Sequence, residues 1–290
     1  MSRSHDAATR ATYRIPESRM SVSIKNAEEI EKMRVAGRLA SELLDFITPH
    51  VRSGVTTGEL DRIAHDYQVN VQQVVPATLN YAPPGHRPYP ASICTSVNEQ
   101  IVHGIPGKRK LKEGDIIGID AGAIVDGWHA DAAITVPVGK ISAEAQKLIT
   151  VTREALARGI AMAKVGNRLG DIGAAVQQYA ESQGFSVVRN YVGHGIGRAM
   201  HEEPQVPNYG TADLGRAIKE GLCIAIEPMV NIGGFATRVL EDNWTVVTED
   251  GSLSAHFEHT LACLPDETVV LTRVEEAANG AGRERASATA

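Results

Sequence analysis

The centre of the sequence contains two apolar segments joined by a tight-turn signal. Residues 116–125 form a nearly continuous apolar run, Asp126-Gly127 follows it, and residues 128–136 return. Asp-Gly between two such segments is the strongest two-residue signal for a β-hairpin, because both positions tolerate the positive φ that the turn requires. The chain is therefore predicted to contain a long, buried pair of antiparallel strands.

The predicted hairpin also brings two carboxylates together. We take Val125 to face Trp128 across the turn, and counting back along both strands then places Gly122 opposite Asp131. Asp120 lies two positions from Gly122 on the same face, so Asp120 and Asp131 become diagonal neighbours roughly 7 Å apart at the backbone. Both carboxylates can then hold one cation or bridge two. Either aspartate alone is more often a solvated residue, but the two together among apolar neighbours indicate a site.

Three later segments place further ligand-type side chains beside apolar runs. His194 lies between two glycines after residues 187–192, which suits an imidazole ligand at the end of a strand, although alone it is equally compatible with a solvent-facing loop. Glu227 ends an apolar run and Glu258 precedes one, and a buried carboxylate needs a partner. Four carboxylates would offset the four positive charges of two divalent cations. The five residues together predict metal-assisted hydrolysis.

Motifs in a fixed order extend this pattern over most of the chain. They are Ser96-Val97-Asn98-Glu99, His103-Gly104-Ile105-Pro106, Asp115 to Asp120, Asp126 to Asp131, Gly193-His194-Gly195-Ile196-Gly197, His201-Glu202-Glu203-Pro204-Gln205-Val206, Ile226-Glu227-Pro228, Asn243-Trp244-Thr245 and Ser252 to Thr260. On these motifs the sequence resembles the type I methionine aminopeptidases of bacteria, from about Ser23 to Thr272. The resemblance implies an α+β fold of the pita-bread (creatinase/aminopeptidase) type, with a curved antiparallel sheet backed by helices and two halves related by a pseudo-twofold axis.

The resemblance also implies a metal site. By similarity, Asp120 chelates one ion, Asp131 and Glu258 bridge two ions, and His194 and Glu227 complete the second site; all five positions match the family pattern. The expected cofactors are two divalent ions per chain. Mixed carboxylate and imidazole ligands admit Co, Mn, Fe or Zn, so the sequence leaves the choice of metal open.

The implied activity is removal of the N-terminal methionine of nascent proteins when the second residue is small. A hydroxide that bridges the two metal ions would attack the peptide carbonyl. The resemblance assigns Glu227 to the proton of that water, and it assigns His103 and His201 to hydrogen bonds with the peptide near the cleaved bond. Without the resemblance, His103 would be an ordinary loop histidine before a Gly-Ile-Pro turn.

The methionine side chain of the substrate requires a flexible, apolar pocket. The family positions that line it here are Tyr89, Cys94, Met200 and Trp244. The segment just upstream, Tyr81 to Pro90, departs from the family pattern, because Pro83 and His86 replace the usual Cys and Tyr. This segment either alters the shape of the pocket or forms a rigid, proline-rich surface loop.

A short internal repeat supports two related halves. Residues 54–60 and 166–172 share the pattern Gly-x-x-x-Gly-acid-aliphatic, and each follows a predicted helix and begins another. The preceding helices are expected from Ala27 to about Ile47, with Asn26 as cap, and over about 143–163, with Ser142 as cap. Seven positions alone would also fit coincidental glycine caps.

Composition limits the remaining possibilities. The chain has 290 residues, 43% of them hydrophobic, and no long polar linker, so we predict a single catalytic domain over 20–273, flanked by disordered segments 1–19 and 274–290. The net charge of −6 provides no basic face for nucleic acid, and three cysteines without paired spacing fit a reducing cytoplasm. No apolar run is long enough for a membrane helix. We expect a cytoplasmic monomer that meets nascent chains at the ribosome.

Two other classes of function share this scaffold. Prolidase-like and aminopeptidase P-like enzymes have the same fold, but the chain lacks their large N-terminal domain and carries Trp244 and the segment 103–106 instead. A non-catalytic binding protein would have lost ligands, whereas all five are present. The type II enzymes carry a helical insertion between His201 and Glu227, and only 26 positions separate these residues here (227 − 201 = 26). The type I enzyme is the preferred interpretation.

Overall fold

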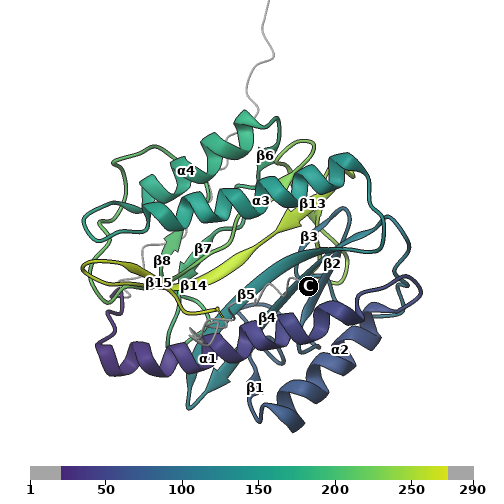
Figure 1. Cartoon of the computed structure of the whole chain (residues 1–290), viewed down its shortest axis with the longest axis horizontal. Coiled ribbons are helices and arrows are strands. Elements are labelled where there is room, and N and C mark those ends of the chain that lie inside the picture. Colours follow the sequence, from purple (N-terminus) through teal and green to yellow (C-terminus); the bar gives the residue numbers. More distant parts are fainter. Residues whose placement is uncertain (1–20, 274–290) are drawn as a thin grey trace, which may run out of the picture.

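A computed structural model describes residues 21–273, which form four α-helices and a nine-stranded antiparallel sheet (Figure 1). The predicted disordered segments 1–19 and 274–290 lie outside the described residues. The sheet runs in the order β1-β4-β5-β14-β9-β7-β8, with β2 also paired to β4 and β15 to β14. Two further three-stranded sheets, β13-β10-β6 and β11-β12-β3, complete the fold. The expected α+β architecture is confirmed.

The helices begin where their sequences provide caps. They are α1 (Ala27–Ile47), α2 (Thr57–Asp66), α3 (Ala143–Met162) and α4 (Leu169–Ser182). The strands are β1 (Val75–Pro76), β2 (Cys94–Val97), β3 (Gln100–Val102), β4 (Ile116–Val125), β5 (Trp128–Pro137), β6 (Ser186–Val187), β7 (Gly193–Gly195), β8 (Glu202–Val206), β9 (Cys223–Ile226), β10 (Met229–Asn231), β11 (Thr237–Val239), β12 (Val246–Thr248), β13 (Ser254–His256), β14 (Glu258–Cys263) and β15 (Thr268–Val270). Asn26 and Glu29 form the predicted capping box, and Ser142 caps α3.

Strands β4 and β5 form the predicted hairpin around Asp126-Gly127. Val125 pairs with Trp128 and Gly122 pairs with Asp131, as counted from the sequence. Asp120 pairs with Ala133, so the two aspartates are diagonal neighbours on one face of the sheet. Gly122 is required between them, because a Cβ at this position would lie 2.8 Å from the Cβ of Ala77 and 3.3 Å from Oδ1 of Asp131.

Alternation along the strands separates a helix-covered face from the face that carries the polar residues. Ile117, Ile119 and Ala121 of β4 pack with Leu43 of α1 and Leu60 of α2 in one buried cluster. In the other half, a second cluster joins residues of β9 and β14 to α3 and α4. In the view of Figure 1, α1 and α2 lie below β4 and β5, and α3 and α4 lie above β14. Asp120 therefore points away from α1 and α2.

The two halves repeat their local structure at the helix pairs. Gly54 and Gly166 have φ of 92° and 95°, a region that favours glycine. Three residues after each helix cap, an acid accepts the cap's backbone N–H: Glu59 from Thr56 and Asp171 from Arg168, each at 2.7 Å. Both cap residues also form isolated antiparallel bridges, Thr56 with Lys110 and Arg168 with Ala217. These matched features support the duplication inferred from the repeat.

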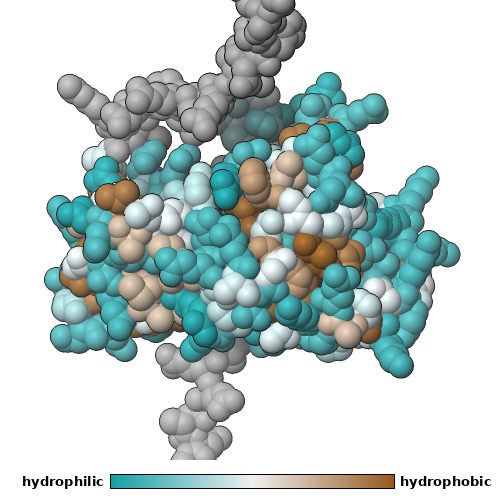
Figure 2. Space-filling view, turned by 90° about the horizontal axis from the view of Figure 1, so that it is seen from above, coloured by the Kyte–Doolittle hydropathy of each residue, from teal (hydrophilic) through white to brown (hydrophobic). Residues whose placement is uncertain are grey.

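The outer surface is mainly polar on the face seen in Figure 2, with hydrophobic residues in scattered patches. Within residues 21–273, no helix combines the length and hydropathy that crossing a membrane would require. A cavity of about 690 Å³ lies between β5 and α3 on the helix-covered side. It is lined by residues such as Val136, Glu154 and His259, and none of the predicted metal ligands reaches it.

Candidate metal centre

The five predicted metal ligands come from both halves of the molecule. Asp120 and Asp131 lie on β4 and β5, whereas His194 lies on β7, Glu227 directly follows β9, and Glu258 begins β14. His194, predicted at the end of a strand, lies one residue from the end of the three-residue strand β7. Its neighbour across the sheet is Ala225 of β9. Pairing of β7, β9, β14 and β5 brings the distant segments together.

Two overlapping groups of side chains have the spacing of a metal site. One ligand atom each from Asp131, His194 and Glu258 lies within 4.8 Å of the others, and the same holds for Glu227, His256 and Glu258. Glu258 belongs to both groups, as a bridging ligand would. Oε1 of Glu227 also lies 3.5 Å from Nε2 of His194, which closes the arrangement.

Asp120 joins the cluster through Asp131. The two carboxyl groups share a hydrogen bond, and the thiol of Cys94 also contacts Asp120. Oδ1 of Asp120 and Oε1 of Glu258 are buried without a hydrogen-bond partner. Unpartnered buried carboxylate oxygens are costly, and a cation is the partner that would satisfy them.

The carboxylates are hard to ionise together. Burial raises the pKa of Asp120 to about 6, and burial together with neighbouring carboxylates raises the pKa of Asp131 and of Glu258 well above the ordinary range. Burial, and then the charge of Asp120, does the same for the pKa of Glu227. Like charges crowded in a poorly solvated space explain these directions. Divalent cations would reverse them, so the donor set fits metal ions.

The imidazole of His194 is in the form that binds a metal. Its Nδ1 lies 2.9 Å from the carbonyl oxygen of Gly195, which can only accept, so Nδ1 carries the proton and Nε2 keeps a free lone pair. Burial lowers the pKa of His194 to about 4, which keeps the ring neutral at pH 7. Nε2 is the atom that faces Glu227.

His256 is a polar residue of the cluster that the sequence analysis did not include. It ends β13, only 3% of it is exposed, and its Nε2 has no hydrogen-bond partner. Nε2 lies 3.8 Å from Oε2 of Glu227, and burial lowers the pKa of His256 to about 3. The sequence signal that could have identified His256 is its position two residues before Glu258, on the same face of an extended segment.

His201 and His103, the two predicted substrate-binding histidines, lie differently in the site. The ring of His201 stacks on His194 with centroids 4.0 Å apart, and its Nδ1 lies 2.8 Å from the hydroxyl of Tyr81. The ring of His103 stands edge-on to Trp244 at 6.0 Å and burial lowers its pKa to about 4. His103 directly follows β3 and has a φ of 58°, so its backbone is in the left-handed region and outside the strand.

Three of the four predicted pocket residues form one buried cluster. Tyr89, Cys94 and Trp244 pack together, with Tyr89 edge-on to Trp244 at 5.2 Å. Met200 is also buried but does not belong to this cluster. The ring of His86 lies 5.3 Å from that of Trp244, so the unusual segment 81–90 borders the pocket. Residues 84–88, His86 included, are exposed, so the segment is at once a surface loop and a neighbour of the predicted pocket residues.

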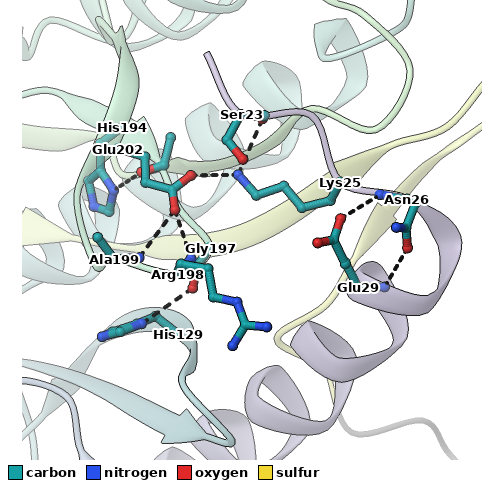
Figure 3. Close-up of polar contacts among 11 residues, drawn as sticks. Ser23, Lys25, Asn26, Glu29, His129, His194, Gly197, Arg198, Ala199 and Glu202 are labelled. Carbon is teal, nitrogen blue, oxygen red and sulfur yellow. Dashed lines mark hydrogen bonds and ion pairs between the residues drawn. The ribbon is translucent and has the colours of Figure 1, made fainter. Parts of the chain in front are cut away.

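A buried ion pair supports the turn that carries His201. Nζ of Lys25 lies 2.6 Å from Oε2 of Glu202, and the two side chains are only 2% and 15% exposed. Figure 3 shows Glu202 reaching from this contact to the backbone N–H groups of Arg198 and Ala199, which donate to its Oε1 at 2.7 and 3.1 Å. The ion pair therefore connects the start of the described chain to the segment between His194 and His201.

Comparisons with known proteins agree with a metal centre. The model of metallopeptidase family M24 matches residues 31–264. The chain belongs to this family. As an M24 member it is similar to the methionine aminopeptidase of Salmonella typhimurium, with 51% identity over 87% of this chain and 94% of the relative. The methionine aminopeptidase of Clostridium perfringens is 48% identical over 88% of this chain and its own full length.

Solved structures of M24 relatives have the same fold. The methionine aminopeptidase of Rickettsia prowazekii superposes with a TM-score of 0.84 at 44% identity, covering 87% of this chain and 100% of that one. A Xaa-Pro dipeptidase of Bacillus anthracis superposes with a TM-score of 0.68 at 20% identity and shares the fold alone, over 62% of its length. The pita-bread fold expected from the resemblance is confirmed.

Proposed function

We propose that this M24 member is a metal-dependent aminopeptidase that removes N-terminal methionine from polypeptides whose second residue is small. The observation that carries this proposal is the buried carboxylate cluster beside the Nε2 lone pair of His194. Relatives that are about half identical over nearly their full length are named methionine aminopeptidases. The prolidase-like alternative rests only on a shared fold.

The proposed ligands are Asp120, Asp131, His194, Glu227 and Glu258, which would hold two divalent ions of Co, Mn, Fe or Zn. Such ions supply a nucleophile at neutral pH by acidifying water, and they polarise the peptide carbonyl. The shared position of Glu258 in both ligand groups supports a bridging role. Metal binding would displace the protons that the four crowded carboxyl groups hold in the metal-free protein.

The remaining chemistry is assigned to this chain's own side chains. Glu227 takes the proton of the attacking water on a carboxylate oxygen and returns it to the leaving amine, as a carboxylate within reach of that water can. His103 and His201 donate hydrogen bonds to the peptide as its carbonyl carbon becomes tetrahedral. Tyr89, Cys94, Met200 and Trp244 accommodate the methionine side chain, and the cluster of three of them supports this assignment.

Under this proposal, the natural substrates of the enzyme are nascent polypeptides in the cytoplasm. The enzyme would act on them as a monomer near the ribosome. Selection of a free N-terminus follows from the requirement that the amino group bind within the buried site.

The proposal is tested with peptides and a metal-stripped enzyme. Met-Ala-Ser, Leu-Ala-Ser and a Met-Pro peptide are incubated with the full chain before and after Mn, Fe, Co or Zn is restored. We expect release of methionine from Met-Ala-Ser that depends on added metal and exceeds release of leucine at least tenfold, since residues contacting the side chain set specificity. Equal cleavage of all peptides, or none with bound metal, would contradict the proposal.

A further inference from the structure

Tyr81 contacts His201 through both its hydroxyl and its ring. The hydroxyl oxygen lies 2.8 Å from Nδ1 of His201, and the ring centroids are 5.2 Å apart with an interplanar angle of 21°. On its other side the His201 ring stacks on His194. The imidazole of His201 is thus held between an aromatic ring and a proposed metal ligand, with one of its two nitrogens occupied.

The chemistry of the two groups indicates which one donates. A neutral phenol has one proton to donate, and imidazole has one protonated nitrogen and one basic nitrogen. Phenol is the more acidic partner and imidazole the more basic, so the favoured hydrogen bond runs from the Tyr81 hydroxyl to Nδ1 of His201. Nδ1 is then an acceptor, and the ring's single proton lies on Nε2.

The backbone places Tyr81 at a fixed position relative to the pocket. The N–H of Tyr89 donates to the carbonyl oxygen of Tyr81 at 2.8 Å, and the N–H of Asn80 donates to the carbonyl oxygen of Tyr89 at 2.9 Å. These two hydrogen bonds close the loop between Tyr81 and Tyr89. Tyr89 in turn is anchored, because its hydroxyl donates to the carbonyl oxygen of Gly104 at 2.8 Å. The hydroxyl of Tyr81 is thereby held by the same structure that forms the pocket wall.

We propose that Tyr81 is a positioning residue that fixes His201 in the Nε2–H tautomer, so that His201 presents a hydrogen-bond donor to the peptide. The inference rests on the proposed function, which gives His201 its role at the cleaved bond. It also gives a role to the unusual segment 81–90. Tyr81 itself need not touch the peptide, because its effect passes through His201.

The first test replaces the hydroxyl alone. Tyr81→Phe keeps the ring and removes the donor, and we expect kcat for Met-Ala-Ser to fall roughly threefold to tenfold, the usual effect of one neutral hydrogen bond. KM should change less than twofold, since His201 acts mainly as the carbonyl becomes tetrahedral. Tyr67→Phe is the matched control: Tyr67 stacks on Phe46 of α1, and its variant should retain wild-type kcat.

A double-mutant cycle separates positioning from direct contact. If Tyr81 acts through His201, Tyr81→Phe should cause no further loss of kcat in a His201→Ala background. Multiplicative losses, or wild-type kcat in Tyr81→Phe while His201→Ala is impaired, would overturn the inference. If the wild-type enzyme fails to release methionine with every metal, the proposed function has failed instead, which the same assay reveals.

The tautomer is measured directly by ¹⁵N NMR of the Zn-loaded, full-length chain, with the His201 signals assigned by their loss in His201→Ala. In the wild type, the one-bond N–H coupling and ring shifts should place the proton on Nε2. Tyr81→Phe should shift the equilibrium toward the other tautomer. A wild-type proton on Nδ1 would overturn the inference regardless of activity.

Discussion

Asp131 lies at the point where most groups of the candidate site meet. It shares a ligand group with His194 and Glu258 and a hydrogen bond with Asp120. Its backbone N–H donates to Oγ1 of Thr260 at 2.9 Å, and that hydroxyl donates back to its carbonyl oxygen at 2.8 Å. Neighbouring strands thus hold Asp131 firmly in place before any metal binds.

Asp131→Asn should abolish activity and lower metal content. An amide offers one neutral oxygen in place of a bridging carboxylate, so both metal sites would weaken. We expect kcat/KM to fall at least 100-fold and the bound metal, measured by atomic emission, to drop below the wild-type ratio. Asp45→Asn, at an exposed position of α1, is the control. Wild-type turnover with full metal content in Asp131→Asn would refute the bridging assignment.

Asp120→Asn should stabilise the metal-free protein at neutral pH. The pKa of Asp120 is raised from 3.8 to about 6, so ionising it in the folded state costs stability. The cost is absent below about pH 4 and complete above about pH 6, where removing it should raise the free energy of unfolding by roughly 1–3 kcal/mol. Urea denaturation of the chelator-treated variant and wild type at pH 4 and 7.5 measures this. An equal difference at both pH values would contradict the prediction.

The sequence predicted some site residues better than others. Asp120 and Asp131 could be related by counting from Asp126-Gly127, since a two-residue turn sets the register of both strands. Tyr81 gave no local signal, because it meets His201 across 120 positions of chain. His256 was also missed, although it precedes Glu258 by two positions. Contacts that depend on tertiary packing have no pattern within either segment.

At the scale of elements, the segment from β7 to β8 is held by a buried ion pair in addition to the antiparallel pairing of the two strands. Lys25 follows the isolated bridge between Ile24 and Leu222, and its Nζ reaches Glu202 at the first position of β8. A Cβ at Gly197 would lie 2.9 Å from Nζ of Lys25, so the turn passes close over the lysine. His201 directly precedes Glu202, so the ion pair lies at the residue next to this proposed functional histidine.

Lys25→Met should destabilise the protein strongly. It leaves Glu202 without its cation in a largely buried place, and breaking such a pair costs about 3–5 kcal/mol. Thermal or urea unfolding measures the loss. The same substitution at Lys32, whose pair with Glu28 on α1 is exposed, should leave stability nearly unchanged, because water and salt screen an exposed pair. Similar effects of the two substitutions would show that Lys25 contributes no more than a surface charge.

Elements with strong local signals were predicted well. The bounds of α1 matched because Asn26 and Glu29 form a capping box, and the hairpin matched because its turn dipeptide is specific. The short strands β6, β7 and β10 span only two or three residues each, so no alternation can develop in them. Their pairing depends on partners elsewhere in the second half: β6 pairs with β10, and β7 pairs with β8 and β9.

At the scale of the whole molecule, metal binding should couple stability to pH. The raised pKa values mean that carboxyl protons must leave before metal can bind, whereas His194, whose pKa is about 4, competes little at pH 5. We therefore expect metal to raise the unfolding temperature more at pH 7.5 than at pH 5. Each displaced proton changes affinity about tenfold per pH unit below the carboxyl pKa.

Calorimetry of the Zn-loaded and chelator-treated chain at both pH values measures this difference. The Asp131→Asn variant serves as the reference with weakened metal binding. A metal-induced shift that is equal or larger at pH 5 would show that the carboxyl groups release their protons more readily than their surroundings indicate.

The division of the ligands between the halves has a consequence for how the site responds to distant change. Asp120 and Asp131 belong to the first half and His194, Glu227 and Glu258 to the second, and the seam between β5 and β14 is paired only at Glu258–Ala133 and His259–Ala132. Neither half holds all five proposed ligands, and the group of Asp131, His194 and Glu258 forms only across the seam. Substitutions that shift β5 relative to β14 would therefore change the distances between the ligands without altering any ligand residue.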